Sequence, residues 1–526
     1  MMSYNLQTSL FEENTNLSLN KKKKNSKPKI PFLQYQIMEC IFEGCKDGIE
    51  ERVGYPKGSL IIKNAMQSLM EKGMLTNKLE LTELGLLFVK KHYNERHNYP
   101  KYYKDQLEIK ISNNNYLFDY EEEKQNGSEP IFRWYKYLED FPHHFVEDCI
   151  EKYKISKKFY ILDPFVGSGT TLIRSKLKGL KSIGVDINPA MVFISQQKLN
   201  WSIDINKIIE HYNLIIDEFL NTKEEEKDRA LEDSPLRFMP KNELNQWLSP
   251  VKQNEISLMM KIVDKIEDIE IKNLLKFAIT RAAIESSYVA YCPGTTFYPF
   301  RTKPDFLTSF SKIMKWIIED LNLDAVKKFK DVESLVIDGN IKDYAILEPF
   351  QQKIDLIITS PPYPNDLEYT RQTRLEMYLL GFVKSMEDVQ RIKRKMVKGS
   401  TKLIFNKDNP IKEISELKSL KTVVQKISYN LKGKNWGFDY PKMVNMYFSD
   451  MFESMKNFYK VLVKDGSCVL VVGDQTIKGV LIPVAEILLE IGKMIGFKRG
   501  RIELHRKRRS TGHNIAIPEE NLILTK

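Results

Sequence analysis

The spacing of apolar residues divides the first part of the chain into helical and strand-forming stretches. Between residues 30 and 95, apolar positions recur at helical intervals in FLQYQIMECIF and LIIKNAMQSLM, and the alternating stretch LTNKLELT precedes a further helical pattern. Helices with a small β-hairpin are the outline of a winged helix, which can place one helix in a DNA major groove; a small packing domain gives the same outline. We therefore predict a winged-helix-like domain at 30–95.

Two polar stretches border this domain. Residues 1–29 contain the run KKKK and predict a flexible basic arm, which is either solvated or in contact with phosphate groups. Residues 96–130 are charged and aromatic without a clear period, so we interpret them as a linker.

From about residue 131 the pattern changes to short apolar runs that alternate with helical stretches. FYIL, the turn DPFVGSGTT, the helical LIRSKLKGL and SIGVDI form one strand-turn-helix-strand unit of a parallel, doubly wound sheet. Further strands are predicted at KIDLIITS, CVLVVGDQ, GFKRGRIEL and IPEENLILTK. The predicted fold class is α/β, with a Rossmann-like sheet built from 131–198 and 331–526 and a largely helical insertion at 199–330.

Composition and charge narrow the class of protein. The 526 residues are 42% apolar, which is enough for two to four domains with buried cores. The net charge of +11 favours a polyanionic partner such as nucleic acid, although a lysine-rich cytosolic enzyme has a similar charge. Five scattered cysteines argue against a zinc site or a disulfide framework. Without a signal peptide or a long apolar window, the chain is predicted to be cytoplasmic and free of membranes.

Two acids and two glycines mark a ligand site at the ends of the first two predicted strands. Gly167 and Gly169 allow the backbone to approach a ligand, and the helix after them begins with unpaired N–H groups. Asp163 suits a cationic ligand better than a phosphate, and Asp186 can accept both hydroxyls of a ribose. A ligand with a ribose, a cationic amino-acid end and no phosphate is S-adenosylmethionine. A structural glycine turn in another α/β protein is the alternative.

The predicted strand KIDLIITS ends in a rigid turn. Ser360, Pro361, Pro362 and Tyr363 follow it directly, and the two prolines fix φ. Open α/β sheets bind their ligands at the carboxyl ends of their strands, so we expect this turn beside the cofactor site. A strand-ending turn without a function is the alternative.

Together these motifs resemble those of the amino-methylating DNA methyltransferases. ILDPFVGSGTT and GVDINP match the family's cofactor motifs, TSPPY matches its catalytic tetrapeptide, and RWYKYLEDFPHHF resembles its additional cofactor motif. The resemblance runs, with gaps, from about Trp134 to Lys526. It implies transfer of a methyl group from S-adenosylmethionine, with no metal, to an exocyclic nitrogen of cytosine or adenine, and the serine at position 360 is typical of the cytosine-N4 group. It implies cofactor-binding residues at Phe141, Asp163, Pro164, Phe165, Gly167, Gly169, Thr170, Asp186, Asn188 and Asp338, the last of which is equally compatible with a charged loop residue that binds nothing.

The tetrapeptide suits this chemistry on physical grounds as well. An exocyclic base amine is a poor nucleophile because its lone pair is delocalised into the ring. If the Ser360 hydroxyl and the Pro361 carbonyl accept the two N–H groups, the nitrogen moves towards tetrahedral geometry and its lone pair is freed. Tyr363 would stack on the base after it has been flipped out of the duplex. Pro362 helps to position these groups before the substrate arrives.

Several segments are candidates for DNA contact. The insertion at 199–330 contains the Pro, Gly and aromatic cluster SSYVAYCPGTTFYPFRTKPDF, which suits a target-recognition loop. Residues 384–434 hold 14 Lys or Arg against 5 Asp or Glu, and 505–514 form a second basic segment; either is a candidate phosphate contact or a solvated surface. Arg371 and Arg374 are expected either to bind a phosphate beside the flipped base or to pair with Glu368 or Glu376.

The sequence therefore predicts a site-specific DNA methyltransferase that acts on cytosine N4 in double-stranded DNA, as the protective partner of a restriction endonuclease. Adenine-N6 methylation and RNA base methylation are the alternatives within the enzymes. A DNA-binding regulator with an inactive methyltransferase fold is the alternative from another class. The oligomeric state, monomer or dimer, is left open.

Overall fold

A computed structural model of the chain describes residues 32–42, 44, 49–53, 57–97, 129–137, 142–291, 295–297, 303–509 and 516–526. The chain forms two compact units, residues 1–91 and 92–526. The predicted arm at 1–29 and most of the predicted linker lie outside the described residues.

The first unit is helical. Its helices are α1 (Phe32–Phe42), α2 (Ile49–Arg52), α3 (Leu60–Glu71) and α4 (Glu83–His97). Between α3 and α4 the chain turns back on itself through a single antiparallel bridge, Leu75 with Leu81. The described part of this unit thus contains a small turn where the pattern predicts a wing, and the winged-helix assignment stays a prediction.

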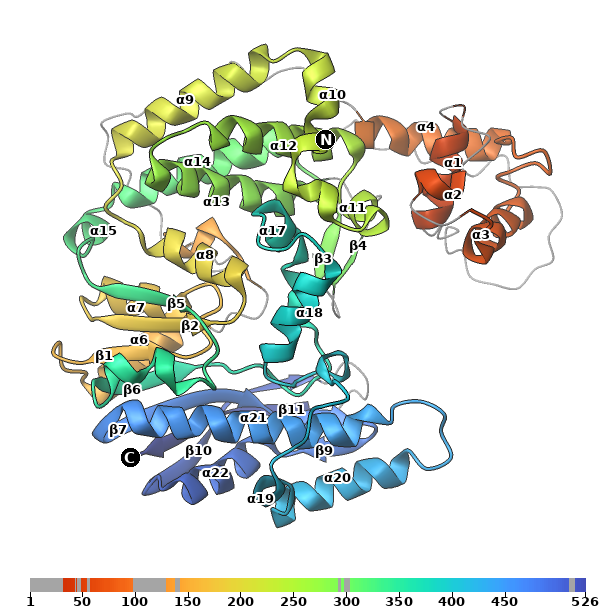
Figure 1. The fold of residues 1–526 in the computed structure, drawn as a ribbon. Helices are drawn as coiled ribbons and strands as arrows, with labels where there is room; N and C mark the ends of the chain where they lie inside the picture. The colour runs from red at the N-terminus through yellow and green to blue at the C-terminus, as the bar shows by residue number, and fades with distance from the viewer. Residues whose placement is uncertain are drawn as a thin grey trace, which may run out of the picture. The chain divides into compact units, whose positions relative to one another are not determined.

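The second unit is built around a mostly parallel sheet (Figure 1). Among the described residues this sheet has seven strands in the order β10-β11-β7-β6-β1-β2-β5. The strands from β7 to β5 are parallel, and β11 is antiparallel to both β7 and β10. The strand bounds are β1 (Tyr160–Asp163), β2 (Ser182–Asp186), β5 (Ser334–Asp338), β6 (Ile354–Thr359), β7 (Leu462–Gly473), β10 (Arg499–Arg509) and β11 (Ala516–Thr525). The predicted α/β class and the two closing strands are confirmed.

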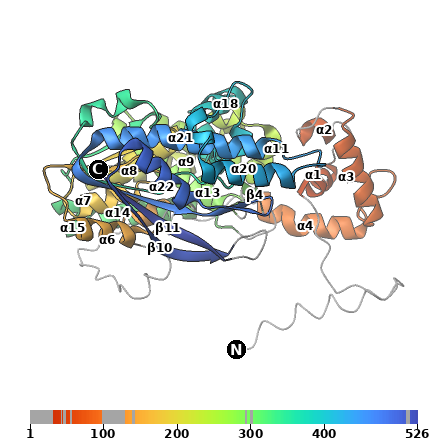
Figure 2. The ribbon, with the colours of Figure 1, turned by 90° about the horizontal axis from the view of Figure 1, so that it is seen from below.

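Helices cover both faces of this sheet (Figure 2). On β7, Cys468, Leu470 and Val472 pack with the helices α21 and α22, whereas Val469 and Val471 pack with α6 on the opposite face. This alternation follows from the two-residue period of a strand, so β7 is apolar on both sides. The covering helices are α6 (His143–Tyr153), α7 (Thr170–Leu177), α8 (Pro189–Leu199), α21 (Asp439–Val461) and α22 (Val484–Ile495).

A helical region separates β2 from β5, and it shares a core with α7 and α8. It contains α9 (Ile205–Asn221), α10 (Glu224–Asp233), α11 (Lys241–Trp247), α12 (Pro250–Asp264), α13 (Ile269–Ser286), the hairpin β3 (Val289–Tyr291) and β4 (Thr295–Phe297), α14 (Phe306–Leu321) and α15 (Asp324–Lys328). A second excursion between β6 and α21 holds α16 (Tyr369–Gln372), α17 (Arg374–Leu379), α18 (Met386–Lys395), α19 (Lys412–Ser415) and α20 (Lys418–Asn430). The hairpin β8 (Gln475–Ile477) and β9 (Val480–Ile482) follows β7. No helix in the described ranges is long and apolar enough to cross a membrane.

Candidate active site

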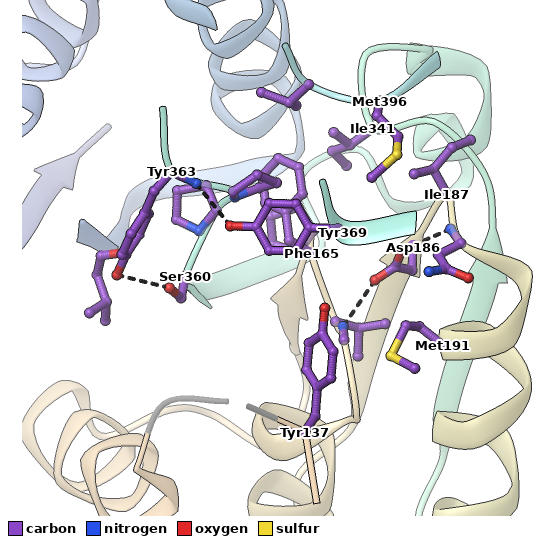
Figure 3. Close-up of a pocket in the computed structure, with 18 of the residues that line it drawn as sticks. Tyr137, Phe165, Asp186, Ile187, Met191, Ile341, Ser360, Tyr363, Tyr369 and Met396 are labelled. Atoms are coloured by element: carbon purple, nitrogen blue, oxygen red, sulfur yellow. Dashed lines mark hydrogen bonds between the residues drawn. The ribbon is translucent and has the colours of Figure 1, made fainter. Parts of the chain in front are cut away.

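A cleft opens at the carboxyl ends of β1, β2, β5 and β6 and encloses about 1220 Å³ of space, including its open mouth (Figure 3). Because β1, β2 and β6 are parallel neighbours, the segments that follow them meet at one edge of the sheet. The cleft brings together ten of the predicted site residues: Pro164, Phe165, Gly167, Thr170, Asp186, Asn188, Ser360, Pro361, Pro362 and Tyr363.

Asp186 connects the glycine turn to the end of β2. One carboxylate oxygen accepts the Gly167 N–H at 3.0 Å, and the other accepts the Asn188 N–H at 2.9 Å. Gly167 has φ of 50°, a left-handed conformation that suits glycine. Burial raises the pKa of Asp186 to about 6. Each oxygen keeps a further lone pair, so the carboxylate can still accept hydroxyl groups from a ligand in the cleft.

The walls around Asp186 suit a nucleoside with a cationic end. Ile187, Met191 and Ile341 supply apolar surface on the side of Asp186, and Tyr137 and Phe165 place two aromatic rings in the same cleft (Figure 3). Apolar side chains can enclose a purine ring, and aromatic faces attract a cation. This set of groups fits S-adenosylmethionine, which carries an adenosine and a sulfonium.

Asp163 occupies a different place from the one expected for a cofactor ligand. Its carboxylate is 1% exposed and accepts the Phe165 N–H at 3.1 Å and the Thr171 hydroxyl at 2.6 Å. Burial raises its pKa to about 6. In this arrangement Asp163 holds the glycine turn onto α7 and lies behind the cleft wall, and its contact with the amino-acid end of the cofactor stays a prediction.

Two other predicted residues do not line the cleft. Gly169, with φ of 91°, precedes α7 and packs against Ser195. Asp338 ends β5 with an exposed side chain, while the residues that follow it, 339–341, line the cleft. Phe141 lies outside the described residues.

Ser360 and Tyr363 are joined at the floor of the cleft, directly after β6. The Ser360 Oγ lies 3.2 Å from the Tyr363 hydroxyl, which in turn lies 3.1 Å from a carboxylate oxygen of Glu519 and 3.3 Å from the Val471 carbonyl. Arg506 donates to the other oxygen of Glu519. Glu519 of β11 therefore fixes the side chain of Tyr363, which follows β6.

These contacts set the direction of the hydrogen bond between Ser360 and Tyr363. A carbonyl and an ionised carboxylate only accept, so the Tyr363 proton goes to Val471 or Glu519. The phenol oxygen then accepts the proton of Ser360, and the remaining lone pairs of the Ser360 hydroxyl are left for another donor. Ser360 is thus arranged as an acceptor for a group in the cleft.

The loop after the tetrapeptide is braced by Asp366. This residue has φ of 63°, and its carboxylate accepts hydrogen bonds from Ser400, Thr401 and the Tyr440 hydroxyl, the last at 2.8 Å. Burial alone would raise the pKa of Asp366, but these hydrogen bonds outweigh it and lower the pKa below its ordinary value. Nearby, Gly399 passes so close that a Cβ on it would lie 2.5 Å from the Tyr363 carbonyl oxygen.

The two arginines near the tetrapeptide differ in their surroundings. Arg374 is 5% exposed and pairs with Glu243 at 2.9 Å and Glu368 at 3.0 Å, so the predicted salt-bridge alternative is the one found. Lys393 also pairs with Glu368. The side chain of Arg371 is partly buried, and its role at a phosphate stays a prediction.

Sequence reasoning missed several residues of the cleft. Glu519 comes from a closing strand, and Met396 and Val471 come from segments without a motif. Tyr137 lies within RWYKYLEDFPHHF and Arg506 within the basic segment 505–514, but neither residue was singled out. Tyr369 also lines the cleft, and its hydroxyl accepts the Tyr363 N–H at 3.2 Å. The only signal that the sequence offers for Arg506 and Glu519 is that the segment RKRR is basic and the segment IPEEN is acidic.

A doubly wound sheet whose glycine turn and Ser-Pro-Pro-Tyr loop line one cleft fits the class of Rossmann-like methyltransferases. Residues 21–197 and 354–515 match a family described as DNA methylase, the N6/N4 methyltransferases. This match covers more than half of the chain, which therefore belongs to the N6/N4 family of DNA methylases. Family membership implies S-adenosylmethionine as the methyl donor.

Curated relatives agree with this family. The type II methyltransferase M.AvaI of Nostoc sp. is 26% identical over 404 residues, which cover 72% of this chain and 81% of the relative. M.BsoBI of Geobacillus stearothermophilus is 26% identical over 437 residues, covering 73% and 82%. M.MvaI of Kocuria varians is 22% identical over 416 residues, covering 74% and 86%.

Proposed function

We propose that this chain transfers a methyl group from S-adenosylmethionine to the N4 amine of a cytosine flipped out of duplex DNA. The observation that carries the proposal is the hydrogen-bond chain from Glu519 through Tyr363 to Ser360, which leaves the Ser360 hydroxyl as an acceptor at the end of β6. The type II relatives support a role as the modifying partner of a restriction endonuclease.

The cofactor site is assigned from the cleft walls. Asp186 would accept the ribose hydroxyls, Ile187 and Met191 would flank the adenine, and the aromatic rings of Tyr137 and Phe165 would face the cationic end. When bound, the cofactor supplies an electrophilic methyl group.

The acceptors around Ser360 would activate the amine. The Ser360 hydroxyl and the Pro361 carbonyl accept its two N–H groups, which localises the nitrogen lone pair towards the methyl group. With the donor held beside Asp186 and Phe165, its methyl group would pass to this nitrogen as the carbon–sulfur bond breaks, and one N–H proton would be lost to water. Binding that is stronger to the tetrahedral nitrogen than to the planar amine lowers the barrier.

The aromatic residue of the tetrapeptide would hold the base. The Tyr363 ring is fixed by contacts at its hydroxyl and its main-chain N–H, so its face is positioned before the base arrives. Stacking on such a ring is tolerant of base identity, because every base has a π face. The preference for cytosine N4 over adenine N6 therefore rests on the serine at position 360, and the insertion at 199–330 stays the predicted target-recognition region.

Identification of the modified nucleoside tests this proposal. The full-length protein would be incubated with tritiated S-adenosylmethionine and either duplex DNA or tRNA, followed by digestion to nucleosides and chromatography. We expect labelled N4-methylcytosine from DNA. Labelled N6-methyladenine, or label in tRNA alone, would show that the proposed substrate is wrong. Absence of cofactor binding by calorimetry would instead favour the regulator.

The role of Ser360 is tested separately. Ser360→Ala should reduce the rate of methyl transfer at unchanged cofactor affinity, because it removes one acceptor for the amine. Ser156→Ala, which removes an exposed hydroxyl in the turn before β1, is the matched control. Full transfer by Ser360→Ala would show that the hydroxyl does not activate the amine.

A further inference from the structure

Exposed aromatic side chains gather where α20 is joined to α21. Tyr429 is 70% exposed, Trp436 is 50% exposed and Phe438 is 67% exposed. Single exposed apolar residues are normal on protein surfaces, but a group of them rimmed by polar residues marks an interaction site. We call this region the α20–α21 surface; it comprises residues 429–440 and the turn between β8 and β9, Ile477–Val480.

Lysines lie over the rings of this surface. The Lys478 Nζ is 4.0 Å from the centroid of Trp436 and 4.4 Å from that of Tyr440, and the Lys434 Nζ is 5.3 Å from Trp436. Lys432 lies over Tyr429 at 5.3 Å. Such cation–π contacts hold the ammonium groups close to the rings while leaving them accessible to an anion.

The α20–α21 surface adjoins the catalytic loop. Helix α21 precedes β7 and runs back along it, so its first turn lies at the carboxyl end of the strand, and Figure 1 shows the α20–α21 connection extending beyond that end of the sheet. Tyr440, in the first turn, donates to Asp366, which lies six residues after Ser360. The surface therefore stands beside the cleft in which the base is expected.

Other cations of the predicted basic segment at 384–434 serve internal contacts. Lys393 is 5% exposed and pairs with Glu368, and Lys398 is 2% exposed and lies 3.4 Å from Asp408. These two lysines stabilise the segment between β6 and α21 through internal ion pairs, so they are not candidates for phosphate binding. The accessible positive charge near the aromatic cluster is that of Lys432, Lys434 and Lys478.

We propose that the α20–α21 surface binds the backbone of duplex DNA next to the flipped base, with the lysines on phosphates and Trp436 and Phe438 against sugars or unstacked bases. The proposal rests on the proposed function for the presence of a flipped base. Lysines interleaved with aromatic rings suit a polyanion whose bases can stack, and phosphate binding releases counterions. A second copy of this chain fits less well, because pairing two such surfaces would bring like charges together.

The proposal is tested by measuring the DNA affinity of the full-length protein and its variants. Fluorescence anisotropy would be measured with a labelled duplex over a series of salt concentrations, for the wild type, Trp436→Ala and the double variant Lys434→Gln with Lys478→Gln. Loss of a stacking ring should weaken binding by roughly 5- to 100-fold. Loss of two phosphate contacts should reduce the slope of log affinity against log salt by about 2.

A matched control separates this effect from loss of charge. Lys456 and Lys460 are also exposed and lie over rings, Phe452 at 5.3 Å and Tyr344 at 4.2 Å, but they occupy the opposite end of α21. The double variant Lys456→Gln with Lys460→Gln should bind DNA as the wild type does, and cofactor affinity measured by calorimetry should be the same for all variants.

The outcomes distinguish this proposal from the proposed function. If the wild type methylates DNA but Trp436→Ala and the Lys434/Lys478 variant bind DNA as the wild type does, the surface assignment is wrong and the methyltransferase stands. If these variants instead change only the sedimentation of the protein, the surface is an interface between two copies. If the wild type methylates no DNA yet the variants lose DNA affinity, the proposed function falls, and the surface binds DNA without a flipped base beside it.

Discussion

Replacing Tyr363 by phenylalanine isolates the hydrogen bond that orients Ser360. The variant keeps the aromatic ring for stacking and removes only the phenol oxygen, which lies 3.2 Å from the Ser360 Oγ and 3.1 Å from Glu519. Without that acceptor, the Ser360 proton is free to point into the cleft, where it opposes the N–H groups of the amine. We expect slower methyl transfer with little change in DNA affinity.

The size of the effect follows from the single contact that is lost. One hydrogen bond contributes about 0.5–1.5 kcal/mol, which corresponds to roughly a 2- to 13-fold lower rate if the contact acts in the transition state. A single-turnover measurement with tritiated S-adenosylmethionine and saturating DNA reports this step without product release.

Tyr160→Phe is the matched control for Tyr363→Phe. The Tyr160 hydroxyl also donates to a carboxylate, Glu333 at 2.9 Å, but it lies at the start of β1, away from the cleft. The control should transfer methyl groups at the wild-type rate. If Tyr363→Phe were equally active, or if it changed only DNA affinity, the argument that the phenol orients Ser360 would be refuted.

Three further predictions concern the surroundings of the tetrapeptide and the cofactor. Gly399→Ala should lower the transfer rate by about fivefold or more, which corresponds to a cost of about 1 kcal/mol or more, because the new Cβ would meet the Tyr363 carbonyl oxygen at 2.5 Å; an unchanged single-turnover rate would contradict this. Tyr440→Phe removes one of the donors to Asp366 and should destabilise the fold by about 1 kcal/mol, which in a unit of several hundred residues lowers the melting temperature measured by calorimetry by about 1 °C; a wild-type melting temperature would argue against the brace. Asp186 is ionised above its raised pKa of about 6, so cofactor affinity should fall by up to about tenfold per pH unit below that value; titration calorimetry showing a flat profile would count against ribose binding by the carboxylate.

The local motifs could be predicted from the sequence because each lies within one continuous segment. The turn from Asp163 to Gly169 and the tetrapeptide after β6 carry their own signals, namely glycines, prolines and an apolar strand. Their meeting in one cleft followed from the rule that parallel strands present their carboxyl ends at the same edge. The two closing strands could be predicted from the apolar pattern of their own segments.

Partner choice among polar side chains could not be predicted in this way. Asp163 accepts the hydroxyl of Thr171, which lies in the first turn of α7, and Arg374 pairs with Glu243, which is 131 residues away in a helical insertion. Nothing in the local sequence distinguishes these partners from other acids and hydroxyls. The same holds for Glu519, whose role depends on β11 lying next to β7.

The support of Tyr363 by Glu519 has a consequence for the order in which the protein acquires its structure. These two residues are 156 positions apart, and β11 is the last strand of the sheet in chain order. A ribosome synthesises β1, β2 and β6 long before it reaches β11, and contacts of such long range form slowly because a large loop must be closed first. The nascent chain can therefore assemble its cofactor half early, while the tetrapeptide gains its final hydrogen bonds only once residue 519 has emerged and β11 has paired with β7. A new molecule would therefore begin to transfer methyl groups only after β11 has paired and the sheet is complete.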